Sequence, residues 1–136
     1  MGETSKQHAR IKILPTGWLN NDDATYQRIL FEDDSNTYGT KPGWTNHELY
    51  KAVDIPHGWK AVSYRVNSSQ NRAVSFVVVS LENGSGATDS QAGNANSNIT
   101  LATPYISANN TYALIKYDPS STADIIYGGW IECVRL

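Results

Sequence analysis

Hydrophobic and polar residues alternate along most of this chain with a period of two. The clearest case is residues 59–67, where Val62, Tyr64 and Val66 are predicted to share one face of a strand. Such alternation is typical of a strand buried on one side only. Residues 72–82 are instead β-branched and almost continuously apolar, which predicts a central strand covered on both faces. No segment shows the 3.6-residue period of an amphipathic helix.

Eight segments carry a strand-like pattern, and Gly, Asn and Ser turns separate them. They are residues 9–15, 27–33, 47–55, 59–67, 72–82, 97–103, 111–118 and 123–136. This succession predicts an all-β fold: an antiparallel β-sandwich, most simply a jelly roll of about eight strands, with an up-and-down barrel as the alternative. Residues 1–8 are polar and predict a flexible arm, and residues 9–136 then form a single domain.

Three smaller features qualify this picture. Residues 83–98 contain no aromatic residue and no aliphatic residue larger than Ala, so a mobile loop is predicted there. Gly128 and Gly129 interrupt the last strand, which indicates a bulge or a close backbone approach. Cys133 is the only cysteine, so no intrachain disulfide can form.

Composition and charge narrow the classes of partner. The net charge is −2 with a pI near 5.8, which argues against a nucleic-acid binder. The first residues lack an apolar signal segment, and no apolar run approaches the ~20 residues of a membrane span. We therefore expect folding in a reducing cytoplasm, with neither a nucleic-acid nor a membrane partner.

The motifs of catalysis are weak. Cys133 lies inside a strand pattern, where a buried thiol that packs as a small hydrophobe is the ordinary case. Four acids lie on or beside predicted strands, and two of them could converge as a hydrolase pair, but no spacing places any pair together: Glu32, Glu48, Glu82 and Glu132. We therefore expect a non-enzymatic protein without a cofactor. The acidic stretches 20–24 and 31–35 lack the spacing of an EF-hand loop, so no metal site is assigned and Ca²⁺ binding stays open.

Aromatic residues in predicted loops suggest a binding site of another kind. Trp18, Tyr38, Trp44 and Trp59 lie in or beside loops, among Asn, Asp and Thr. Flat rings with amide and carboxylate neighbours can hold a sugar, so these four are the candidate glycan contacts. The favoured alternative is that the rings seal the ends of the sandwich.

The stretch "IPHGWKA" (55–61) predicts a tight corner before the strand at 59–67. Pro56 fixes its backbone angle and Gly58 permits a positive φ, so the pair favours a turn. Trp59 is expected to anchor this corner by packing, and His57 is expected to be exposed without a role.

Three stretches together resemble a known family. "IKILP" (11–15), "IPHGWKA" (55–61) and "IYGGWIEC" (126–133) resemble, in order, small β-rich virion structural proteins of tailed marine and cyanobacterial phages. The resemblance implies a capsid decoration protein or an appendage or fibre subunit that acts through protein–protein contacts. Its expected partners are other copies of itself and other virion proteins, and its expected location is the virion after folding in the host cytoplasm. The alternative is a carbohydrate-binding module or receptor-binding tip that contacts a host-surface glycan.

Overall fold

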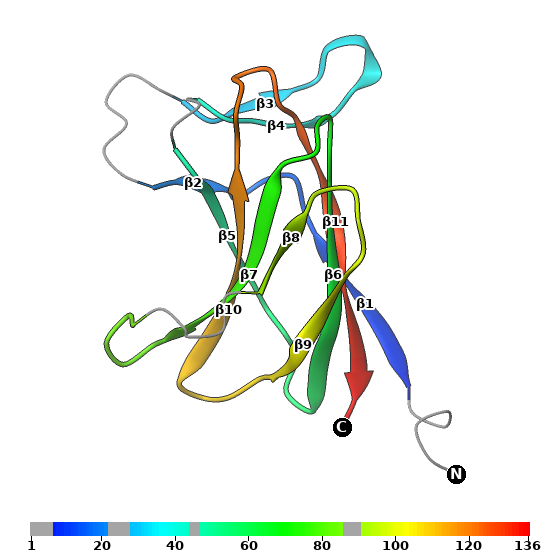
Figure 1. The fold of residues 1–136 in the computed structure, drawn as a ribbon, viewed down its shortest axis with the longest axis vertical. Coiled ribbons are helices and arrows are strands. Elements are labelled where there is room, and N and C mark those ends of the chain that lie inside the picture. The colour runs from blue at the N-terminus through cyan, green and yellow to red at the C-terminus, as the bar shows by residue number, and fades with distance from the viewer. Residues whose placement is uncertain (1–6, 22–27, 44–46, 86–90) are drawn as a thin grey trace.

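The computed structural model describes residues 7–21, 28–43, 47–85 and 91–136, and it consists of two antiparallel β-sheets packed face to face (Figure 1). The six-stranded sheet contains β1 (His8–Ile13), β3 (Leu30–Glu32), β4 (Gly39–Lys41), β6 (Trp59–Ser68), β9 (Ile99–Ile106) and β11 (Ile126–Arg135). The five-stranded sheet contains β2 (Leu19–Asn20), β5 (Leu49–Val53), β7 (Ala73–Ser80), β8 (Gln91–Asn94) and β10 (Thr111–Asp118).

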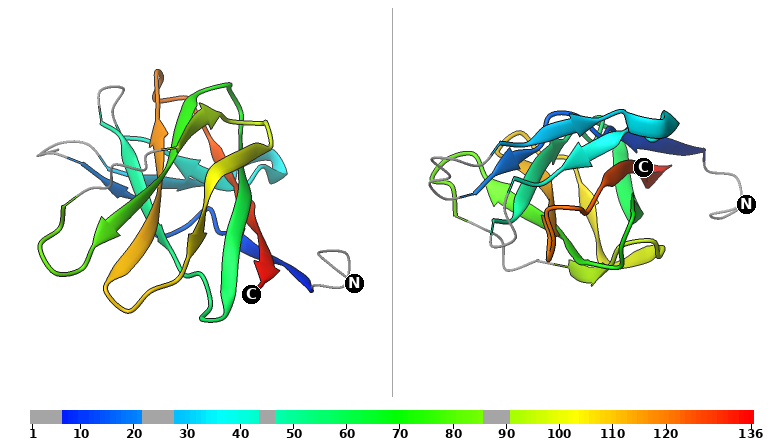
Figure 2. Two further views of the ribbon diagram at one scale, coloured as in Figure 1. Left: turned by 60° about the horizontal axis from the view of Figure 1, so that its bottom comes forward. Right: turned by 90° about the horizontal axis from the view of Figure 1, so that it is seen from above.

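The strand order is that of a jelly roll. One sheet runs β4-β11-β6-β9 and the other runs β5-β10-β7-β8, so β4 pairs with β11, β5 with β10, β6 with β9 and β7 with β8. This is the pairing of one long hairpin rolled into two layers, which Figure 2 shows from two further directions. The predicted antiparallel sandwich is confirmed, and the barrel alternative is wrong because the strands form two separate sheets.

The three remaining strands extend the roll at its edges. β1 pairs with β11 from His8↔Val134 to Ile13↔Gly129, β3 pairs with β4, and β2 pairs with β5. The predicted arm at residues 1–8 is therefore wrong at His8, and residues 1–6 lie outside the described residues. Within the described part of the chain, no helix is long and apolar enough to cross a membrane.

The predicted loop at residues 83–98 is wrong over part of its length. Residues 91–94 form β8, which pairs with β7, and Ala95 behind it is fully buried. Small residues are needed here because the sheets lie close together: a Cβ on Gly93 would lie 2.5 Å from Ile99 Cδ1. Residues 86–90 of this segment lie outside the described residues.

One core fills the space between the two sheets. Its largest fully buried side chains include Tyr64, Phe76, Ile115 and Tyr117. A buried phenol needs a hydrogen-bond partner, and each tyrosine has one: the Tyr64 hydroxyl donates to the Gln91 carbonyl oxygen at 2.7 Å, and the Tyr117 hydroxyl donates to Ser68 Oγ at 3.2 Å. Both contacts connect one sheet to the other.

A bulge in β6 changes the predicted alternation. Tyr64 and Val66 are buried as predicted, but Ala61 is also fully buried and Val62 is partly exposed. Ser63 pairs with Glu132 of β11, and the next residue of β11, Cys133, pairs with Ala61, so Val62 has no partner in the register and is the extra residue. Because side chains alternate along a strand, this extra residue reverses the alternation in the part of β6 that precedes Val62, so Ala61 faces the core there.

The glycine pair in β11 has the predicted role. The pairing with β6 shifts between Ile126 and Gly128, and Gly128 has φ +126°. A Cβ on Gly129 would lie 2.0 Å from the Arg65 carbonyl oxygen, so the backbones approach as closely as glycine allows.

The "IPHGWKA" corner is also as predicted. The Trp59 backbone N–H donates to the Pro56 carbonyl oxygen at 3.2 Å, and Gly58 has φ +89°. This is the hydrogen bond of a four-residue turn with glycine where a positive φ is required. Trp59 packs partly buried against the core, and His57 is exposed.

A buried ion pair closes the opposite end of the sandwich. The Asp124 carboxylate is fully buried and accepts hydrogen bonds from Arg72 Nε at 2.8 Å and from Arg72 Nη2 at 3.0 Å. The Tyr117 hydroxyl and the Ser120 backbone N–H also donate to it, at 3.4 and 3.3 Å. The loop before β11 is thereby connected to the loop before β7.

Candidate functional site

The four candidate aromatic residues do not form one site. Trp18 is only 4% exposed, belongs to the core, and donates from Nε1 to the Leu14 carbonyl oxygen at 3.2 Å. Its placement matches the alternative that these rings seal the sandwich. Trp59 is half-buried, with the Arg135 guanidinium 5.8 Å from its ring centre. Trp44 lies outside the described residues.

Tyr38 is the candidate aromatic residue that presents its ring to solvent, with 57% of its surface exposed. It precedes β4, which pairs with β11 at Thr40↔Ile126, whereas Trp59 pairs with the other end of β11 at Arg135. At about 3.3 Å per residue, the two ends of this strand lie roughly 30 Å apart. Tyr38 and Trp59 therefore cannot contact one small ligand.

The hairpin formed by β3 and β4 gives Tyr38 a different neighbour. Phe31 lies 6.3 Å from Tyr38 between ring centres, and the two planes are tilted by 35°. Phe31 is 50% exposed, so the pair is an aromatic surface at the end of the molecule opposite the β5–β6 corner (Figure 1). Phe31 could not be singled out from the sequence, because it lies inside the strand-like segment 27–33 and not in a predicted loop.

A short 3-10 turn, η2 (Asp34–Asn36), connects these two strands. Ser35 and Asn36 both adopt left-handed backbone angles, with φ +54° and +61°, and the Thr37 N–H donates to the Asp34 carbonyl oxygen at 3.0 Å. Two consecutive left-handed residues are uncommon outside tight turns. The turn brings three carboxylates together.

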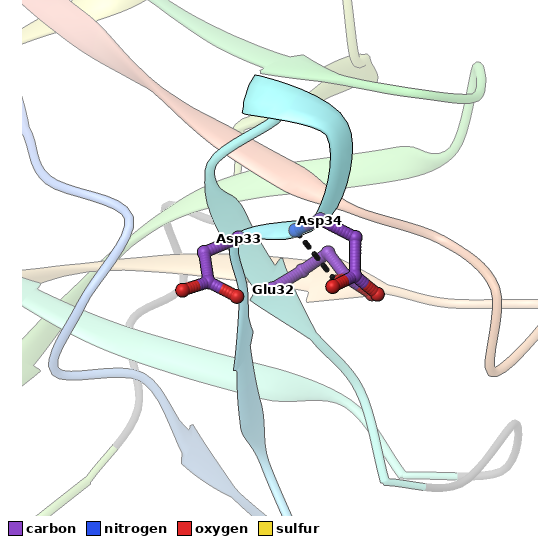
Figure 3. Close-up of side chains that lie close together, drawn as sticks. All are labelled: Glu32, Asp33 and Asp34. Atoms are coloured by element: carbon purple, nitrogen blue, oxygen red, sulfur yellow. Dashed lines mark hydrogen bonds between the residues drawn. The ribbon is translucent and has the colours of Figure 1, made fainter.

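These carboxylates belong to Glu32, Asp33 and Asp34, whose oxygens lie within 4.8 Å of one another (Figure 3). The Asp34 backbone N–H donates to Glu32 Oε1 at 3.1 Å, and Lys41 Nζ lies 3.2 Å from Glu32 Oε2. The bonds from Asp34, and then from Lys41, lower the pKa of Glu32. The hydrogen bond with Glu32, and then its charge, raises the pKa of Asp34.

Carboxylate oxygens are the ligands that Ca²⁺ prefers, and it takes roughly six to eight oxygens. The group of three acids offers some of these, but Lys41 already supplies a competing positive charge to Glu32. Residues 22–24 of the other acidic stretch lie outside the described residues. The geometry adds no ligand beyond the three acids, so we assign no metal here.

Cys133 is a packing residue. Its side chain is fully buried in the core. Burial, and then the charge of Glu132, raises the pKa of its thiol to about 11. Because the thiolate is the nucleophile, a thiol held protonated at neutral pH is poorly suited to catalysis.

Two of the candidate hydrolase acids, Glu48 and Glu132, face away from each other. Glu132 contacts Arg10 at 2.7 Å on the outer side of the six-stranded sheet. Glu48 pairs with Lys116 at 3.5 Å, and Lys116 points outward from β10 between the buried Ile115 and Tyr117. The proposed convergence of Glu48 and Glu132 is therefore wrong, because one acid lies on each outer surface of the sandwich.

The outer side of the five-stranded sheet is unusually apolar. Outward-facing residues of β10, β7, β5 and β2 lie opposite one another in register, as in Ala52–Leu114–Val77 and Tyr112–Val79. Leu19 at the edge is 70% exposed, and Val79 is nearly buried although it lies outside the core. We call this surface the apolar face; it comprises Leu19, Tyr50, Ala52, Val77, Val79, Tyr112 and Leu114.

No protein-family model matches the chain, and no curated protein matches it significantly. Among solved structures, one similar chain is the Clostridium thermocellum N-terminal endo-1,4-β-D-xylanase 10B, CBM22-1–GH10 modules, complexed with xylohexaose. The match is 15% identical with a TM-score of 0.44, and it covers 95% of this chain but 28% of that one. A similarity of that size carries no inference about function.

Proposed function

We propose that this protein is a non-enzymatic structural subunit that packs against a second copy of itself through the apolar face. The observation that carries the proposal is the row Ala52–Leu114–Val77 on the outer side of the five-stranded sheet. In an antiparallel sandwich the outer residues are ordinarily polar. A contiguous apolar surface on a folded domain marks a contact with another molecule.

A second copy is the partner that needs the fewest assumptions. A twofold axis through the centre of the sheet, near Leu114, would lay this apolar row against itself, so one patch serves both subunits. Two charged residues of β10, Lys116 and Asp118, lie on this side of the sheet; Asp118 is exposed at the end of the strand, and Glu48 pairs with Lys116. Closing the contact would therefore not bury an unpaired lysine. The resemblance to phage virion proteins supports the same role.

Light scattering coupled to size-exclusion chromatography tests the contact. Wild-type protein is expected to be oligomeric, and Leu114→Lys is expected to produce monomers with an unchanged circular dichroism spectrum. Leu81→Lys is the matched control, because Leu81 is 60% exposed beyond the end of β7. Ala52→Lys gives the same test at an exposed position if Leu114→Lys does not fold. A wild-type monomer at millimolar concentration would refute the proposal.

The place in a virion needs its own experiment. Mass spectrometry of purified phage particles should detect the protein at a stoichiometry that is a multiple of the oligomer size. Its absence from particles would contradict the virion role without affecting the solution contact. Electron microscopy of labelled particles would separate capsid decoration from an appendage or fibre.

A second candidate function is glycan binding by the β3–β4 hairpin. Phe31 and Tyr38 present an exposed aromatic pair on this hairpin, and such rings can stack on a sugar. A glycan array with wild type, Tyr38→Ala and the control Tyr127→Ala tests this; Tyr127 is 42% exposed on β11. Binding that survives Tyr38→Ala would exclude the hairpin.

A further inference from the structure

The outer side of the six-stranded sheet carries an aromatic ring between two arginines. The Arg10 guanidinium carbon lies 4.2 Å from the Trp130 ring centre, and that of Arg65 lies 5.9 Å from it. Arg10 belongs to β1 and Arg65 to β6, and these strands pair with β11 on its two sides. A guanidinium stacked on an indole is held in place and keeps N–H groups at its edge for a ligand.

This surface is strongly basic although the whole chain is acidic. Lys12 lies opposite Trp130 in register, and Lys60 lies opposite Val134 two rows further along. On this side, β1, β11, β6 and β9 carry four cations and one carboxylate, that of Glu132, so their formal charge is +3. The net charge of the whole chain is −2. We call this surface the basic face; it comprises Arg10, Lys12, Lys60, Arg65 and Trp130.

Arg65 is oriented without being neutralised. Its Nε donates to Asn67 Oδ1 at 2.7 Å and its Nη1 donates to Asn98 Oδ1 at 3.3 Å, and both acceptors are uncharged amides. Among the described residues, no carboxylate forms an ion pair with Arg65 or with Lys12. Two cations in this row therefore keep their full charge for a ligand.

Neutral polar groups lie in the next row. Ser63 lies opposite Thr100 on β9 and opposite Glu132 on β11. Hydroxyl and amide groups beside two cations match the chemistry of a charged sugar, whose carboxylates would contact the cations and whose hydroxyls would contact the polar row.

We propose that the basic face binds an acidic polysaccharide through its carboxylates, with Arg65 and Lys12 as the charged contacts and Trp130 as the ring that holds the Arg10 guanidinium beside them. Nucleic acid is disfavoured as the ligand because its phosphates, with one charge per roughly 1.7 Å of duplex, far outnumber the few cations of this face. The inference concerns the sheet opposite the apolar face and does not depend on self-association.

Affinity electrophoresis in native gels containing polygalacturonate tests the proposal. Mobility is compared with gels containing neutral dextran, so that changes in protein charge cancel. Wild type is expected to be retarded by polygalacturonate, and added salt is expected to release it. Arg65→Gln and Lys12→Gln are each expected to weaken the interaction by about tenfold, the loss of one charge-assisted contact. Lys51→Gln removes the same charge from the other sheet, at a position that is not on the apolar face, and should change nothing.

Three results would overturn the inference. The first is a wild-type mobility that polygalacturonate leaves unchanged. The second is equal retardation of wild type and a Lys12→Gln variant whose melting temperature matches wild type; Lys12 is exposed, so its replacement is compatible with folding. The third is tighter binding to single-stranded DNA than to polygalacturonate at equal charge concentration, which would make the surface a general polyanion site.

Discussion

Replacing Asp124 with Asn is expected to remove a large part of the protein's stability. The side chain is fully buried, and its two oxygens accept both hydrogen bonds from Arg72 as well as those from Tyr117 and Ser120. Asn has nearly the same shape, so the change removes charge rather than volume. The amide NH₂ group of Asn would face Arg72 or Tyr117, and because both groups are hydrogen-bond donors, no hydrogen bond could form between them.

The size of the effect follows from burial. Breaking a buried ion pair by removing one partner costs about 3–5 kcal/mol. The whole free energy of unfolding of a domain is only about 5–15 kcal/mol. We expect the lower end of the first range for Asp124→Asn, because the Arg72 side chain is 25% exposed and can be partly hydrated.

Urea unfolding followed by tryptophan fluorescence measures this loss. With a slope of about 1–3 kcal/mol per molar urea, the midpoint should fall by more than 1 M. The matched control is Glu132→Gln, which breaks the exposed pair with Arg10, where the side chains are 56% (Arg10) and 32% (Glu132) exposed. Exposed pairs contribute roughly 0–1 kcal/mol, so the control midpoint should hardly move. Equal midpoints for the two variants would refute the claim that burial determines the cost.

Three further predictions concern the backbone at two glycines, the buried thiol of Cys133 and the buried phenol of Tyr117. Gly129→Ala should yield no folded protein by circular dichroism, because its Cβ would lie 2.0 Å from the Arg65 carbonyl oxygen. Gly58→Ala should only lower the urea midpoint slightly. Nothing lies within 4 Å of a Cβ at this position, and the left-handed backbone costs about 1–2 kcal/mol. Folded protein from both variants would contradict the first claim. Burial raises the pKa of Cys133 from 9.0 to about 11, so its stabilising effect is present below pH 9 and is lost as the pH rises through 11. Cys133→Ala should therefore lose less stability than wild type between pH 8 and pH 11, and parallel losses in urea would show that the thiol is not responsible. Burial likewise raises the pKa of Tyr117 from 10.0 to about 12, and Tyr117→Phe should show the same reduced sensitivity between pH 10 and pH 12.

The long strands could be predicted because each buries one face along most of its length. β6, β7, β10 and β11 are eight to ten residues long, and their apolar periodicity is unmistakable. β4 and β8 belong to the jelly roll equally but have three and four residues, none of them a large aliphatic residue. Their partners β11 and β7 determine their extended form, and the chain carries no local signal for that.

The surfaces were harder to predict than the core. Trp18 and Tyr38 have similar polar neighbours in sequence, yet one is in the core and the other is exposed, because only Trp18 lies between the two sheets. The continuous apolar run at residues 72–82 predicted a strand covered on both sides, which is wrong for the outer side, where Val77 is partly exposed. It could not indicate that one of those sides faces out of the molecule rather than toward another layer.

The basic face could not be predicted because charge was averaged over the whole chain. Lys12 and Arg65 are far apart in sequence and come within one row only through the pairing of β1 and β6 with β11. The net charge of −2 correctly describes the molecule but conceals a surface of the opposite sign. The low pI therefore disfavours an anionic partner for the average surface but not for the outer side of the six-stranded sheet.

The two sheets of the sandwich thus have outer surfaces of opposite character, and this makes the two main proposals separable. Dimerisation through the apolar face would cover β10 and β5 and leave Arg65 and Trp130 on the far side of each subunit. A dimer would then present two basic faces pointing in opposite directions, and a long acidic polymer could be held by many such dimers. Since Leu114 and Arg65 lie on different sheets with the core between them, a substitution at one should leave the function of the other intact. Loss of both functions from either substitution would mean that the chain has one binding surface and that its outline differs from both faces described above.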